Sequence, residues 1–121
     1  MTKLEELIQE LAMERERLTD LQVEANIAFS RTTDLVQQEV LVDLIDDIST
    51  QLRLVTKNLI ALRTHHPDVQ NAFESLKSLA DRSREVAGEM AAAEDKVKAM
   101  TDSVAAATAF IKAVRKITLI G

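Results

Sequence analysis

The chain contains no cysteine, two glycines, one proline and no tryptophan or tyrosine; its only aromatic residues are three phenylalanines. The lack of cysteine excludes disulfide bonds, thiol chemistry and thiolate metal centres. A β-rich fold would need more turn residues and more aromatic and β-branched strand residues. Small-molecule pockets are usually lined by aromatic side chains. These absences favour an all-α protein and argue against an enzyme with a ligand pocket.

Long apolar runs are also absent. No stretch approaches the ~18 apolar residues of a membrane span, and the first residues, MTKLEE, lack the apolar core of a signal peptide. We therefore expect a soluble, cytoplasmic protein, with secretion by a route without a cleaved signal as the alternative. The net charge of −5 disfavours nonspecific binding to nucleic acid, so we predict no nucleic-acid partner.

Apolar residues in the second half of the chain recur at alternating steps of four and three residues from Ala72 to Thr118. This is the a/d spacing of a coiled coil, and it requires a partner helix along its length. Similar stripes begin at Leu4 and Leu41. The pattern predicts one domain over residues 1–121, with long antiparallel helices in a three- or four-helix coiled-coil bundle.

Capping signals set the expected limits of the first two helices. Thr2 begins a capping box and predicts a helix over 3–30, and Asp34 begins a second one and predicts a helix over 34–64. The two apolar stripes differ in phase by one residue. A tight turn between them absorbs this difference, and one long helix with a stutter is the alternative. Pro67 ends the second helix.

The third helix is expected over 68–100, and the chain beyond residue 100 fits two models. The cluster Thr101-Asp102-Ser103 resembles an N-cap and would start a fourth helix over 103–119 that folds back. The apolar steps nevertheless continue through this cluster without a phase change. An unbroken helix would be ~75 Å long and would need a partner chain, whereas the folded-back model would not.

Two polar clusters are candidate sites. Adjacent His65 and His66 could begin a zinc site, but zinc needs three or four ligands, and a polar turn before proline is the favoured interpretation. Four acids lie opposite the apolar stripe of the second helix, where a solvated face is favoured over a cation or basic-partner site: Glu39, Asp43, Asp46 and Asp47. We predict no bound metal and no cofactor.

The last segment is basic, and after Thr101 its only acid is Asp102. Lys112, Arg115 and Lys116 alternate with apolar residues, as in helices that lie on anionic membranes or in partner grooves. If the chain folds back, these cations would instead approach the acidic start of the first helix. Membrane contact is the less favoured interpretation.

No catalytic signature is present, since the sequence has no Gly-x-Ser-x-Gly motif and no glycine-rich loop. We therefore expect a non-enzymatic protein that mediates protein–protein assembly as a scaffold, adaptor or structural subunit, forming a homo-oligomer or binding another helical protein. A membrane-surface or secreted effector acting through the basic end is the alternative. The expected interface, within the bundle or between chains, consists of Val97, Met100, Val104, Ile111 and Val114, and contact between chains is the favoured interpretation. On this expectation, Val104→Asp would produce a monomer.

Overall fold

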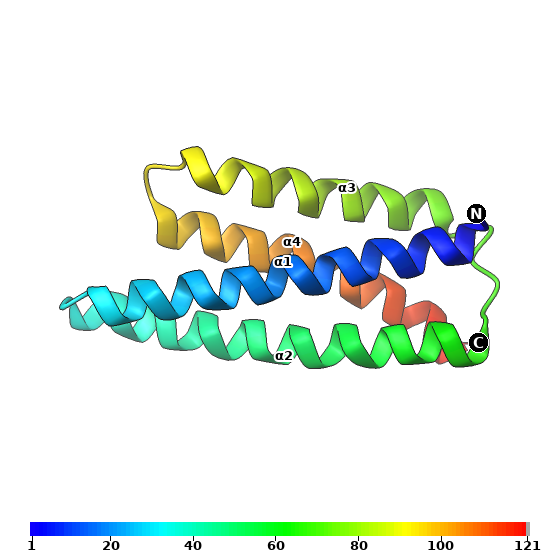
Figure 1. The fold of residues 1–121 in the computed structure, drawn as a ribbon, viewed down its shortest axis with the longest axis horizontal. Helices are drawn as coiled ribbons and strands as arrows, with labels where there is room; N and C mark the ends of the chain where they lie inside the picture. The colour runs from blue at the N-terminus through cyan, green and yellow to red at the C-terminus, as the bar shows by residue number, and fades with distance from the viewer. Residues whose placement is uncertain (121) are drawn as a thin grey trace.

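The computed structural model describes the backbone of residues 1–120 and the side chains of residues 1–119. Within this range the chain forms four α-helices and no strand, which confirms an all-α helical bundle (Figure 1). The short 3₁₀ helix η1 (Met90–Ala92) directly follows the third α-helix. The four α-helices are α1 (Lys3–Arg31), α2 (Leu35–His65), α3 (Phe73–Glu89) and α4 (Lys96–Ile120).

Side-chain caps begin the first two helices. The Thr2 hydroxyl oxygen accepts a hydrogen bond from the Glu5 backbone N–H, and the Asp34 carboxylate accepts from the N–H groups of Val36 and Gln37. Such caps satisfy backbone donors that have no partner within the helix. The chain therefore turns over residues 32–34 rather than continuing as one helix with a stutter.

The connection between α2 and α3 delays the start of α3. His66 lies in the left-handed region (φ 48°) and its backbone N–H donates to the carbonyl of Leu62, which closes α2. The Asp68 carboxylate then accepts from the Gln70 N–H at 3.0 Å, which makes a local turn. Since Asp68 is used in this turn, α3 begins at Phe73 and not at the expected residue 68.

The chain reverses direction at residues 93–95, so the unbroken helix is not formed and the expected limits of 68–100 and 103–119 are wrong. Asp95 caps α4 by accepting from the Lys98 N–H at 3.0 Å, and the Lys96 ammonium donates to the carbonyls of Met90 and Ala91. Thr101 does not begin a helix but lies inside α4, where its hydroxyl donates to the Val97 carbonyl.

The helices pack in the spatial order α1, α2, α4, α3. Helix α1 lies against α2 and α3. Helix α4 lies against the same two helices, whereas α2 does not contact α3 within the described residues. Successive helices are antiparallel as expected, but the neighbours α1 and α3 run parallel, as do α2 and α4 (Figure 1). As a result, α1 begins and α4 ends at the same end of the bundle.

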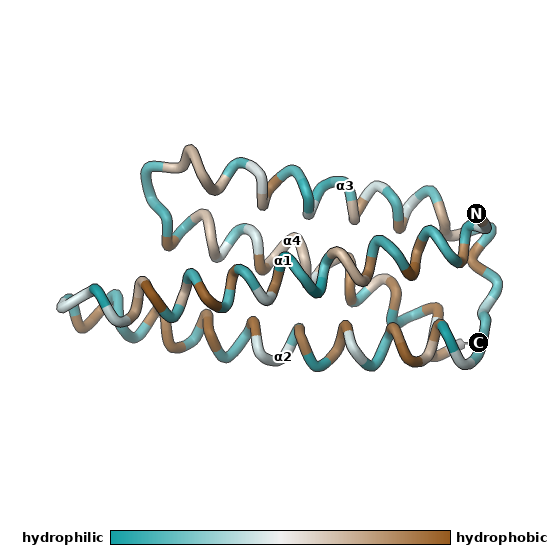
Figure 2. Tube along the Cα trace, viewed as in Figure 1, coloured by the Kyte–Doolittle hydropathy of each residue, from teal (hydrophilic) through white to brown (hydrophobic). Residues whose placement is uncertain are grey.

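The opposite end of the bundle is incompletely covered. Helix α1 has 29 residues, about 44 Å, whereas α3 has 17 residues, about 26 Å. The tip of the α1–α2 hairpin therefore projects beyond the α3–α4 turn (Figure 1). Apolar residues recur along the whole of α2, whereas α3 is mostly hydrophilic or neutral (Figure 2). The projecting tip thus carries apolar residues that α3 and α4 do not reach.

Candidate interaction surfaces

The residues expected to form an interface between chains lie mostly in the core of a single chain. Met100 and Val104 pack with α1 and α2 residues in one apolar cluster, and Ile111 and Val114 belong to the other. All four are buried, and only Val97 is half-buried. These residues therefore form an interface within the bundle, because α4 folds back and its apolar stripe is covered from within the chain.

The basic residues of α4 do not pair with α1. Lys112, Arg115 and Lys116 are exposed, and none of them forms an ion pair among the described residues. The end of α4 does lie at the end of the bundle where α1 begins, but within residues 1–119 these cations do not pair with its acids. These three cations remain available to an external partner.

The histidines and acids considered as metal ligands are exposed. His65 ends α2 and His66 forms its left-handed cap. In residues 1–119, no three side chains of the His, Cys, Asp or Glu types come close enough together to hold a metal ion. The acids Glu39, Asp43, Asp46 and Asp47 follow one another along the exposed side of α2.

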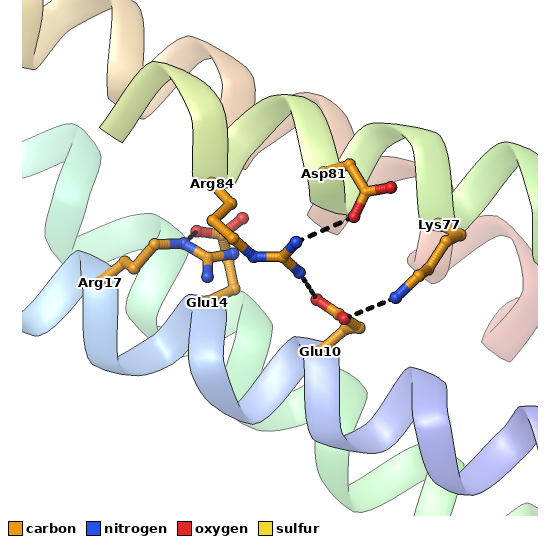
Figure 3. A network of polar contacts seen from close by, with 6 residues as sticks. All are labelled: Glu10, Glu14, Arg17, Lys77, Asp81 and Arg84. Atoms are coloured by element: carbon orange, nitrogen blue, oxygen red, sulfur yellow. Dashed lines mark hydrogen bonds and ion pairs between the residues drawn. The ribbon is translucent and has the colours of Figure 1, made fainter. Parts of the chain in front are cut away.

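A polar network joins α1 to α3 (Figure 3). The carboxylate of buried Glu10 accepts from the Lys77 ammonium at 3.0 Å and from the Arg84 guanidinium at 2.7 Å, and Arg84 also donates to Asp81 at 3.1 Å. The hydrogen bonds that the two cations donate to Glu10, followed by the negative charge of Glu10, raise the pKa of Lys77 and of Arg84. The network holds two parallel helices together at the surface of the bundle.

A second acid of α1 is buried more deeply. Glu14 is 1% exposed, and one of its oxygens accepts from the Arg17 Nε at 3.1 Å (Figure 3). Its other oxygen, Oε1, has no hydrogen-bond partner among the residues that the structure describes, and neither does the buried hydroxyl of Ser83 on α3. The apolar stripe of α1 did not reveal that Glu10 and Glu14 would be buried. The signal available was an acid pair four residues apart among leucines.

The tip of the α1–α2 hairpin exposes large aliphatic side chains. Leu35 is 78% exposed and Val36 is 71% exposed. Below the tip, a groove of about 410 Å³ runs between α1 and the α3–α4 turn, and a second groove of about 430 Å³ runs between α2 and the start of α4. Val36 and Val40 line the second groove together with Val97. Apolar surface is therefore open to partners at this end.

The outward side of α2 divides into an acidic half and a basic half. Its acids end at Asp47, and the residues from 48 to 65 contain only basic or neutral side chains. Arg53 and Lys57 are exposed in the basic half, and exposed aliphatic residues flank the charges, with Val40 on one side and Ile60 on the other. Within the described part of the chain, none of the charged residues on this helix forms an ion pair.

Over the described residues, no helix combines the length and the apolar character that crossing a membrane requires. Comparison of the chain with protein-family models, with curated proteins and with solved structures gives no match. The interpretation of function therefore rests on the surfaces described above.

Proposed function

We propose that this chain is a non-enzymatic assembly protein, a helical coiled-coil bundle that associates with further copies of itself and serves as a scaffold, adaptor or structural subunit. The observation that carries the proposal is the apolar surface exposed on α2 and at the hairpin tip. Five of the exposed aliphatic residues belong to α2: Leu35, Val36, Val40, Val42 and Ile60.

The free-energy gain available from covering this surface is substantial. Burying a valine or leucine side chain completely contributes ~1.5–3 kcal/mol relative to leaving it exposed. Leu35 and Val36 are adjacent and each leaves most of its side chain in water. Single exposed aliphatic residues are common on protein surfaces, but Val36 and Val40 lie four residues apart on one helix and line the same groove, which supports an interaction site.

Self-association is tested by measuring the mass of the protein by light scattering over a wide range of concentrations, with refractive-index detection because the chain has no tryptophan or tyrosine. The mass should rise with concentration. Val36→Ser/Val40→Ser should weaken association roughly tenfold, since two partly exposed valines lose ~1–2 kcal/mol of burial between chains. Leu119→Ser, an exposed residue on α4, is the matched control. A single-chain mass at every concentration would contradict the proposal.

A membrane-surface or secreted effector is the second candidate, and the exposed, unpaired cations of α4 favour it. Lys112, Arg115 and Lys116 have no acid near them in the sequence, since none occurs between Ser103 and Ile120. Basic residues near an anionic bilayer contribute ~1 kcal/mol each. Vesicles containing phosphatidylserine should then float the protein but not its triple glutamine variant. Failure of the unmodified protein to float at low salt would dismiss this candidate.

A further inference from the structure

We infer that two copies of this chain pair through the outward side of α2, antiparallel to each other, about a two-fold axis that passes beside Thr50. The inference rests on the proposed self-association and specifies which surface makes it and in which orientation. Thr50 is the central residue of α2, which runs from Leu35 to His65, so the two helices would overlap along their full length.

The residues that would meet lie on one side of α2. Moving outward from half-buried Thr50, exposed side chains occur three, seven and ten residues away in both directions. Steps of three and four residues keep side chains on the same side of a helix. The buried leucines, Ile48 and Val55 occupy the opposite side, against α1 and α4. Helix α2 lies at the edge of the bundle, so no other helix of the chain covers this side (Figure 1).

The chemistry of these positions is self-complementary about Thr50. In a two-fold antiparallel pair, a residue at a given distance before the axis faces the residue at the same distance after it on the other copy. Asp47 would face Arg53 at three residues, and Asp43 would face Lys57 at seven. At ten residues, Val40 and Ile60, which are both exposed aliphatic side chains in the single chain, would lie at the two edges of the paired surface. Each of these pairs occurs twice in the dimer.

The same arrangement explains an unfavourable feature of the single chain. Asp43 and Asp47 are four residues apart, as are Arg53 and Lys57, and none of the four forms an ion pair with the residues that the structure describes. Like charges at this spacing destabilise a helix, whereas a solvated helix gains from alternating charges. A parallel pair would place each charge beside its own copy. Only the antiparallel pair sets the acidic half against the basic half.

The size of the surface predicts a reversible dimer. Helix α2 has 31 residues and is about 46 Å long, and a strip about 10 Å wide along it covers on the order of 500 Å² on each copy. This is below the ~800 Å² per partner of stable complexes, so the dimer should dissociate on dilution. The hairpin tips, with their grooves, would point in opposite directions at the two ends of the particle.

Charge exchange tests the orientation. Asp43→Lys/Asp47→Lys makes all four charged positions of the pairing basic, and Arg53→Glu/Lys57→Glu makes all four acidic. Each variant alone should associate at least roughly tenfold more weakly than the unmodified chain, because every charged contact becomes repulsive. An equimolar mixture should form a dimer containing one chain of each kind. All four residues are exposed, so circular dichroism should show unchanged helix content.

A single cysteine tests the position of the axis, because the chain has none of its own. Only a residue beside a two-fold axis meets its own copy, so Thr50→Cys should form a disulfide-linked dimer on mild oxidation. Thr64→Cys, exposed near the end of the same helix, is the matched control and should link far more slowly.

The outcomes separate this pairing from the proposed function. If the unmodified chain associates but the charge mixture stays single-chain, or Thr64→Cys links as fast as Thr50→Cys, the α2 pairing is wrong and self-association through another surface stands. If the unmodified chain is single at every concentration, both are wrong.

Discussion

Replacing the buried pair of Glu14 and Arg17 by apolar residues should stabilise the fold. The structure places the Glu14 side chain in the apolar stripe of α1, with one carboxylate oxygen bonded to Arg17 and the other without a partner. An Nη2 nitrogen of Arg17 is also buried without a partner. The double variant Glu14→Leu/Arg17→Met removes both charges, keeps similar side-chain volumes and continues the apolar stripe between Leu11 and Leu18.

The expected gain is about 1–3 kcal/mol. A buried acceptor left without a hydrogen bond costs ~1–3 kcal/mol, and replacement of both members of a buried ion pair by apolar residues is neutral or stabilising by up to ~4 kcal/mol. The loss of the Glu14–Arg17 bond offsets part of this, but the Arg17 side chain is 20% exposed and part of its charge already reaches solvent. For a chain of this size, each kcal/mol corresponds to a rise in Tm of roughly 3–6 °C.

Urea denaturation followed by far-ultraviolet circular dichroism measures the free energy of unfolding. The matched control is Lys98→Met/Asp102→Leu, which removes an ion pair of the same kind at an exposed position on α4. Exposed pairs contribute ~0–1 kcal/mol, so the control should change stability little. A double variant at Glu14 and Arg17 that is less stable by more than about 1 kcal/mol would show that the buried pair is a net source of stability, and the reasoning would be refuted.

Three further changes probe the fold. Asp95→Ala removes the cap of α4 and should lower the free energy of unfolding by about 1 kcal/mol in denaturant titrations. The control is Glu94→Ala at an exposed position, which should leave the free energy of unfolding unchanged. Val104→Asp places an unpaired carboxylate in the core, so calorimetry should show a large loss of Tm. The sequence alone suggested only a shift to monomer, and an unchanged Tm would show that α4 is not packed as described. Glu10 raises the pKa of Lys77 above the ordinary 10.5, so the folded state binds this proton more tightly than the unfolded state. The stabilisation of the fold by this pair is therefore present below pH 10.5 and is lost as the pH rises through the folded pKa of Lys77. Lys77→Gln should remove that alkaline loss from a series of thermal scans, and an unchanged pH profile would show that the Glu10–Lys77 pair does not persist in solution.

Helix type and the starts of α1 and α2 could be predicted from the sequence because they depend on local chemistry. Thr2 and Asp34 cap α1 and α2 as their spacing predicts, and Pro67 lies just beyond the end of α2. The reversal at residues 93–95 was harder to locate. The apolar steps from Met90 to Val97 keep the coiled-coil spacing although the chain changes direction between them, so an unbroken period does not show an unbroken helix.

The neighbours of each helix could not be deduced from the periodicity. An apolar stripe shows that a helix is covered, but it does not identify which helix covers it. The burial of Glu10 depends on α3 lying beside α1, since Lys77 and Arg84 come from a segment far away in the sequence. In contrast, the acidic and basic halves of α2 are visible in the sequence, and the structure adds that this side is exposed.

The connectivity of the bundle is one of several that would suit the same packing. Because α1 begins and α4 ends at the same end, a flexible linker could close the backbone into a ring without moving any helix. The entropy cost of closing such a loop grows only slowly with its length. Opening the ring at residues 66–72 would give a circular permutant in the order α3, α4, α1, α2, in which every side-chain contact between helices is retained.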